Sequence, residues 1–143
     1  MLTVWICEDD PKYQDIEWSF LEQVGAEKNL NFQVRPFYDG ETLLKHAEKF
    51  YMEPDIIFMD ILLWEINGIE VSNILRKMGT KAEIIFITSS REHVFESFDS
   101  NPLHYIVKSP NFTDQLRKIM NKAVDLLSKE DDNFVFKAKS VTN

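Results

Sequence analysis

The chain has 143 residues, with 24 acidic and 16 basic side chains and a formal net charge of −8. This length suits one domain with a single sizeable core. The negative charge argues against nucleic-acid binding by this segment, because such binding depends on clustered Lys and Arg side chains. The only cysteine, Cys7, excludes an intrachain disulfide and a CxxC metal or redox motif, so we expect a reducing, cytoplasmic location. We expect no secretory leader and no contact with the membrane, because no apolar run approaches roughly 18 residues.

Short apolar runs rich in β-forming residues alternate with longer stretches of helical period. This order predicts an α/β fold, with a parallel sheet covered by helices. The runs 56–59 and 84–87 are apolar on both alternating faces, as expected for central strands between two helical layers. The five predicted strands are Leu2–Cys7, Asn31–Phe37, Asp55–Met59, Ile84–Thr88 and Leu103–Val107.

Helices are predicted after each of these strands. Asp10 can cap the first helix, with Pro11 in its first turn. The second is expected at about 41–50, the third between Gly68 and Gly79, and a short fourth at about 92–99. The fifth, at 112–127, has the clearest helical period, with apolar residues at spacings of three and four.

A change of composition follows Leu127. The sequence becomes Ser-Lys-Glu-Asp-Asp-Asn, typical of a polar linker, and Phe134-Val135-Phe136-Lys137 then has the pattern of a strand. We therefore expect one domain at residues 1–127, followed at 128–143 by a linker and the start of a further, C-terminal domain.

Polar side chains follow four of the predicted strands, at the sheet edge where ligands bind in open α/β folds. Glu8 and Asp9 follow the first strand, Asp60 follows the third, Thr88 ends the fourth and Lys108 follows the fifth. Carboxylates held close together repel one another, which favours a hard divalent cation, and Mg²⁺ in particular. With the cation bound, Asp60 could attack a phosphoryl group, while Lys108 offsets charge on the transferring oxygens and Thr88 donates a hydrogen bond.

The order Glu8-Asp9, Asp60, Thr88-Ser89, Tyr105 and Lys108 resembles the receiver domain of bacterial response regulators over residues 1–127. The resemblance implies a flavodoxin-like (βα)5 fold with strand order 2-1-3-4-5. It also implies a phosphoryl group received from a sensor histidine kinase, and no enzymatic activity beyond self-phosphorylation and autodephosphorylation. A homodimer formed on activation, through the face made by residues 92–99, 103–107 and 112–127, is a further implication.

The resemblance assigns roles on the metal side of the site. Asp60 corresponds to the phosphoacceptor, and Asp9 to a direct Mg²⁺ ligand. Glu8 corresponds to an acid that acts through water. Leu62 corresponds to the residue whose backbone carbonyl completes the metal shell, so its side chain is free to vary.

On the opposite side of the acceptor, Thr88 corresponds to the switching hydroxyl, Lys108 to the phosphate-pairing lysine and Tyr105 to the aromatic ring that turns inward on activation. The family usually has proline after this lysine, joined by a cis bond, whereas this chain has Ser109. A cis bond to a non-proline residue costs roughly 3 kcal/mol. Two alternatives therefore stay open: a strained cis bond, or a trans bond with a different approach of Lys108. Other departures are Glu8, Trp64 and Asn67, where Asp, Pro and Asp are commoner.

Three segments resemble the LytTR-type subgroup: Cys-Glu-Asp-Asp-Pro, Thr-Ser-Ser and Phe-Val-Phe-Lys. In that subgroup the receiver precedes a mostly β DNA-binding domain, so DNA would be contacted only through a C-terminal domain.

Other functions fit the sequence less well. An aspartyl phosphatase would need a general acid at Leu62, and a nucleotide or flavin module would need a Gly-rich or hydroxyl-rich loop where Glu8-Asp9-Asp10-Pro11 stands. The main alternative is a pseudo-receiver that acts as a phosphorylation-independent interaction module. Phe95 and Phe98 are candidates for either the core or a partner surface.

Overall fold

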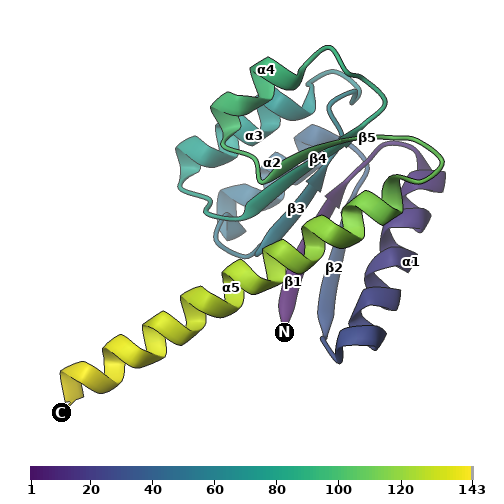
Figure 1. Cartoon of the computed structure of the whole chain (residues 1–143). Coiled ribbons are helices and arrows are strands. Elements are labelled where there is room, and N and C mark those ends of the chain that lie inside the picture. Colours follow the sequence, from purple (N-terminus) through teal and green to yellow (C-terminus); the bar gives the residue numbers. More distant parts are fainter. Residues whose placement is uncertain (143) are drawn as a thin grey trace.

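The computed structural model describes the backbone of residues 1–142 and the side chains of residues 1–128. Its five strands form one parallel sheet in the order β2-β1-β3-β4-β5, which confirms the predicted topology (Figure 1). The elements, in chain order, are β1 (Leu2–Cys7), α1 (Pro11–Lys28), β2 (Phe32–Phe37), α2 (Gly40–Phe50), β3 (Ile56–Met59), α3 (Gly68–Met78), β4 (Glu83–Thr88), α4 (Val94–Ser97), the 3₁₀ turn η1 (Phe98–Ser100), β5 (His104–Val107) and α5 (Phe112–Thr142).

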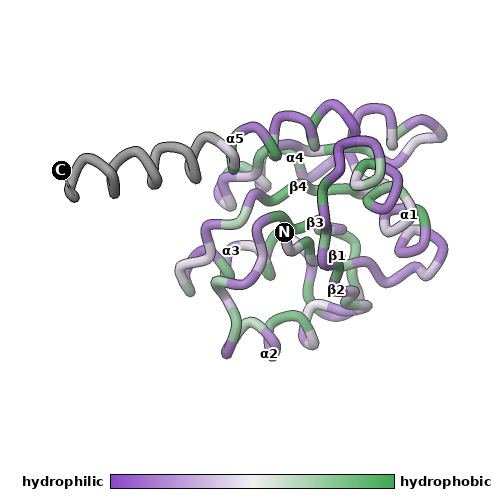
Figure 2. The backbone as a smooth tube through the Cα atoms, turned by 90° about the horizontal axis from the view of Figure 1, so that it is seen from below, coloured by the Kyte–Doolittle hydropathy of each residue, from purple (hydrophilic) through white to green (hydrophobic). Residues whose placement is uncertain are grey.

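Alternating strand residues supply two separate cores, one on each face of the sheet. On one face, Ile6 and Phe58 pack with residues of α1 and α5, and on the other, Trp5 and Ile57 pack with residues of α2 and α3. The apolar strands therefore lie between helices whose outer turns are hydrophilic (Figure 2). Both faces of the central strands are buried, as their uninterrupted apolar sequences predict.

Side-chain hydrogen bonds cap the N-termini of the first three helices. The carboxylate of Asp10 accepts a hydrogen bond from the Lys12 N–H, and Asp39 accepts one from Thr42. The side chain of Asn67 caps α3. Each cap satisfies a backbone donor that the helix cannot pair internally.

The C-terminal segment differs from the prediction. Residues 134–137, predicted as a strand, lie within α5, which continues to Thr142. A strand needs a neighbouring strand for its backbone hydrogen bonds, whereas a helix makes these bonds within itself. The strand prediction is therefore wrong for this chain. The predicted division into residues 1–127 and 128–143 stays a prediction, and the side chains beyond residue 128 lie outside the described ones.

None of the helices in the described part of the chain combines the length and the apolarity that a membrane span requires.

Candidate functional site

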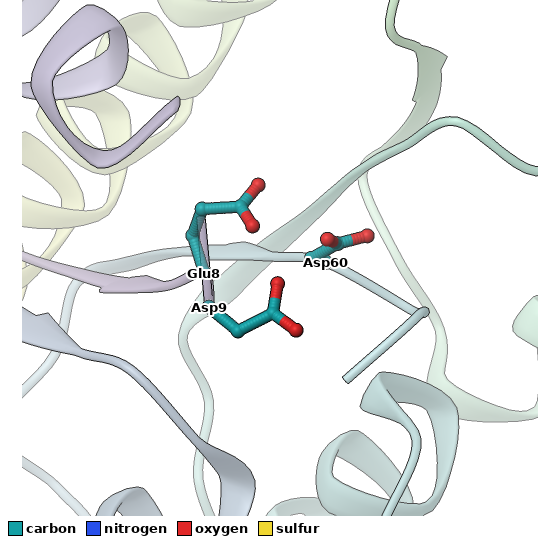
Figure 3. Close-up of side chains that lie close together, drawn as sticks. All are labelled: Glu8, Asp9 and Asp60. Carbon is teal, nitrogen blue, oxygen red and sulfur yellow. The ribbon is translucent and has the colours of Figure 1, made fainter. Parts of the chain in front are cut away.

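Three carboxylates meet at the carboxyl ends of β1 and β3. The two strands are neighbours, with Cys7 paired to Met59, so the residues that follow them come together. The side chains of Glu8, Asp9 and Asp60 each place an oxygen within 4.8 Å of the others (Figure 3). Glu8 and Asp60 are buried, while Asp9 is exposed to solvent. The predicted convergence of the acidic strand ends is confirmed.

Lys108 reaches this cluster from the end of β5. Its Nζ lies 2.5 Å from Glu8 Oε1 and 3.1 Å from Asp60 Oδ2. Burial opposes the positive charge on Lys108, but its hydrogen bond to Glu8 and the charge of Asp60 raise its pKa above the ordinary value. One ammonium group thus pairs with two of the three clustered carboxyl groups.

The pKa of Glu8 records this imbalance. Burial and the nearby charge of Asp60 raise it from 4.5 to about 8, although the hydrogen bond from Lys108 acts in the opposite direction. Removing a charged carboxylate from water is unfavourable, and a second negative charge adds to that cost. An added cation would stabilise the ionised form, so the electrostatics of the pocket favour a hard metal ion.

The bond between Lys108 and Ser109 is trans, because none of the described peptide bonds is cis. This result decides between the two alternatives that the missing proline left open. Ser109 makes no cis bond, and Lys108 still contacts the Asp60 carboxylate. The Lys108 N–H also donates to the Thr88 carbonyl, 2.7 Å away, which continues the pairing of β4 with β5.

Thr88 and Tyr105 both form a hydrogen bond with the same loop residue, Ser90. Thr88 is fully buried at the end of β4, and its Oγ1 accepts a hydrogen bond from the Ser90 N–H at 3.4 Å. The Tyr105 hydroxyl donates to the Ser90 carbonyl, while its ring lies near Phe86. Burial raises the pKa of Tyr105. The predicted switch pair is therefore linked through one residue, Ser90, of the β4–α4 loop.

The loop after Asp60 carries the remaining predicted position, Leu62. Its N–H donates to Asp60 Oδ1 at 3.2 Å, and its side chain is exposed, so the backbone is the part that belongs to the site. The role of its carbonyl stays a prediction. Trp64, which replaces the usual proline, is also exposed.

Three residues of α1 join the site without having been predicted. The Tyr13 ring lies under Lys108, with Nζ 4.1 Å from its centroid. The Gln14 amide donates to the carbonyls of Ile6, Glu8 and Phe37. Glu17 is buried, and its pKa is raised by burial and by the charge of Glu8. Their helical spacing was the available signal, since polar side chains at positions 14 and 17 interrupt a face of α1 that is otherwise apolar.

Comparison with known proteins decides the family. The model of the response regulator receiver domain matches residues 4–121. The chain belongs to the response regulator receiver domain family. The receiver is 41% identical over 109 residues to the sensory transduction protein LytT of Bacillus anthracis, which covers 76% of this chain and 42% of the relative. It is 27% identical to the transcriptional regulatory protein LytR of Staphylococcus aureus, over 90% of this chain and 49% of that protein.

These names support the resemblance to the LytTR-type subgroup, and the receiver spans less than half the length of both relatives. Among solved structures, the response regulator TrrA of Thermotoga maritima in complex with Mg²⁺–BeF has a TM-score of 0.72 at 26% identity, covering 86% of this chain and 99% of that one. The response regulatory domain of mrkE from Klebsiella pneumoniae has a TM-score of 0.77 at 23% identity, covering 90% and 99%, which shows the shared fold.

Proposed function

We propose that this receiver accepts a phosphoryl group on Asp60 from the phosphohistidine of a sensor histidine kinase, in a Mg²⁺-dependent reaction. The observation that carries the proposal is the position of Asp60, which shares its pocket with two other acids and a buried ammonium group. As in other receivers, the phosphoryl group would end on the protein's own side chain and leave by slow hydrolysis. No external substrate is turned over in this scheme.

The donor set fits Mg²⁺. Carboxylate oxygens of Asp9 and Asp60, with the Leu62 carbonyl, are the hard ligands that this ion prefers, and Glu8 would act through water. The bound ion would neutralise charge on the phosphoryl oxygens. Because the pKa of Glu8 is about 8 in the metal-free protein, loading the site near neutral pH would release a proton.

The transfer step belongs to Asp60 and Lys108. An Asp60 oxygen attacks phosphorus while the bond to the histidine nitrogen breaks, and the bonding electron pair leaves with that nitrogen. Lys108 Nζ already lies 3.1 Å from Asp60 Oδ2, so it can pair with the phosphoryl oxygens after a small movement. Its separation from bulk water strengthens this pairing.

The response would begin at Thr88. A phosphoryl group on Asp60 would accept a new hydrogen bond from the Thr88 hydroxyl. In the unphosphorylated protein, the oxygen of this hydroxyl accepts a hydrogen bond from the Ser90 N–H. The Tyr105 hydroxyl is held by the carbonyl of the same residue. Movement of the loop would therefore release or carry Tyr105, which would change the α4–β5–α5 face.

A homodimer formed through that face, acting on an attached DNA-binding domain, is the output that we propose for the full-length cytoplasmic regulator. Phe95 and Phe98 support it, because the structure leaves them 84% and 61% exposed. Their rings lie 6.1 Å apart in an edge-to-face arrangement. Exposed apolar patches and aromatic side chains are typical of protein–protein interfaces, and two adjacent exposed rings fit such a surface.

Phosphorylation is tested by incubating the chain with Mg²⁺ and acetyl phosphate and measuring its intact mass. Wild type should gain one phosphoryl group, and Asp60→Asn should gain none. Asp55→Asn is a matched control at the opposite end of β3, where the carboxylate accepts a hydrogen bond from the Thr3 N–H. No gain in wild type, or an equal gain in Asp60→Asn, would contradict the proposal. It would favour the pseudo-receiver.

Dimerisation is tested by analytical ultracentrifugation with and without Mg²⁺ and beryllofluoride. The mimic should shift wild type to a dimer, and the double variant Phe95→Ala/Phe98→Ala should stay monomeric. Phe50→Ala serves as a control, since Phe50 is an exposed phenylalanine on α2. A dimer that survives the double substitution would place the interface elsewhere.

A further inference from the structure

The Lys108 ammonium has a third partner besides the two carboxylates. Its Nζ lies 4.1 Å from the centroid of the Tyr13 ring, well within the distance at which a cation is attracted to an aromatic face. The Lys108 side chain is only 7% exposed. Because little water surrounds the ammonium, its attraction to the ring is weakly screened.

The Tyr13 ring is itself held in place. Tyr13 lies in the first turn of α1, which the Pro11 ring and the Asp10 cap fix at its start. It packs against the core beneath α1 and α5, with its ring 5.9 Å from that of Phe112. A ring on a helix and in contact with the core is a more rigid support than the loop that follows Lys108.

The three partners of Lys108 differ in what a metal ion does to them. A bound cation would compete with Lys108 for the carboxylates of Glu8 and Asp60. The attraction between these carboxylates and the ammonium would therefore weaken when the metal binds. The Tyr13 ring carries no charge that the metal could take. It is therefore the contact that can keep Lys108 in position in both the metal-free and the loaded site.

We propose that Tyr13 is a positioning residue that holds the Lys108 ammonium at the acceptor pocket through its ring face. This role takes on importance because the Lys108–Ser109 bond is trans, so the loop is not shaped by a cis-proline. Lysine has a flexible four-carbon side chain. A fixed ring restricts this side chain in advance, so that less conformational entropy is lost when the ammonium pairs with a phosphoryl oxygen. The inference rests on phosphoryl transfer to Asp60, as proposed above.

The test compares Tyr13→Phe, which keeps the ring, with Tyr13→Leu, which keeps an apolar side chain and loses the ring. At saturating Mg²⁺, the rate of phosphorylation by acetyl phosphate should fall about 5- to 30-fold in Tyr13→Leu, the range expected for a partly desolvated cation–π contact. Tyr13→Phe should stay within about twofold of wild type, because its ring face is equivalent. In a Lys108→Met background, Tyr13→Leu should have no further effect.

A readout independent of phosphorylation uses the metal-free protein. The ring should shift the NMR signals of the Lys108 ε-methylene protons upfield, and Tyr13→Leu should abolish that shift while Tyr13→Phe retains it. Phe20→Leu is the matched control, because it replaces a buried ring of α1 in the same core. It should lower thermal stability and leave both the rate and the Lys108 signals unchanged.

If Tyr13→Leu does not fold, phenylalanines of increasing fluorination at position 13 weaken the ring face at nearly constant volume, and the rate should fall stepwise. Wild-type rates in Tyr13→Leu, equal losses in Tyr13→Phe and Tyr13→Leu, or rates that ignore fluorination would each overturn the role of Tyr13. A wild-type protein that acetyl phosphate does not modify would instead overturn the proposed function, and the Lys108 signals would still report on the ring contact.

Discussion

Gly68 is the first residue of α3, and replacing it with alanine tests how the loop after Asp60 is packed. A methyl group at this position would lie 1.9 Å from the Asp60 backbone oxygen and 2.8 Å from its carbonyl carbon. Ordinary van der Waals contact begins at 3.4 Å, so the loop would have to move by about 1.5 Å. The obstacle is backbone rather than a side chain that can rotate away.

Helix propensity and packing give opposite signs for this substitution. Propensity alone favours alanine over glycine by up to about 1 kcal/mol, whereas overpacking typically costs about 1–3 kcal/mol. Because the clash is with backbone, we expect a net loss of about 2 kcal/mol in the free energy of unfolding. In a domain of this size, that loss lowers the melting temperature by about 4–8 °C.

Urea denaturation in the presence of a chelator measures the stability change, and calorimetric titration measures Mg²⁺ affinity, which should weaken as Asp60 is displaced. Gly40→Ala is the matched control. Gly40 is the first residue of α2, and its added methyl would come within 2.7 Å of side-chain methyl groups of Ile66 and Val71, whereas the nearest backbone atom, the Ile66 oxygen, would lie at an ordinary contact distance of 3.7 Å. Packing is the wrong explanation if Gly68→Ala is as stable as Gly40→Ala and binds Mg²⁺ like wild type.

Three further predictions concern charge. Without metal, the free energy of unfolding should fall as the pH rises from 4.5 to about 8, because folded Glu8 holds its proton in that window and the unfolded chain releases it. Chemical denaturation should show a flatter dependence of stability on pH in Glu8→Gln. A pH dependence identical to that of wild type would contradict the assignment to Glu8. Lys108→Met should lose about 3 kcal/mol at neutral pH, since the buried Asp60 carboxylate loses its ion partner and Glu8 loses a hydrogen bond. It should also show a larger thermal shift with Mg²⁺ than wild type; an equal shift would argue against electrostatic coupling between Lys108 and the metal site. Asp39→Ala should lose about 1 kcal/mol above pH 5, because a helix cap is removed. The hydrogen bond from the Thr42 N–H lowers the pKa of Asp39. In urea denaturation at decreasing pH, the stability difference between Asp39→Ala and wild type should therefore disappear as the carboxylate becomes protonated.

Much of the fold and the acidic part of the site could be predicted from local patterns. Apolar runs with both faces apolar identify central strands such as β3 and β4, and the polar residues that follow each run define one edge of the sheet. The convergence of Glu8, Asp9 and Asp60 could be expected once β1 and β3 are placed as neighbours, as the resemblance to receiver domains implies, because neighbouring parallel strands place their carboxyl ends side by side. These features depend on periods of two and 3.6 residues, which a short stretch of sequence already contains.

Other features depended on packing between segments distant in the chain. Three such features lie where α1 meets the end of β5. They are the trans Lys108–Ser109 bond with Lys108 still in contact with Asp60, the Tyr13 ring beneath Lys108, and the buried Glu17. Residues 134–137 show the converse, since a pattern typical of a strand forms helix when no strand pairs with it. The sequence by itself determined which strands exist and which acids end them, because both are local. Only the tertiary structure decided how Lys108 is held, because three elements far apart in the chain must pack together before its ammonium has its partners.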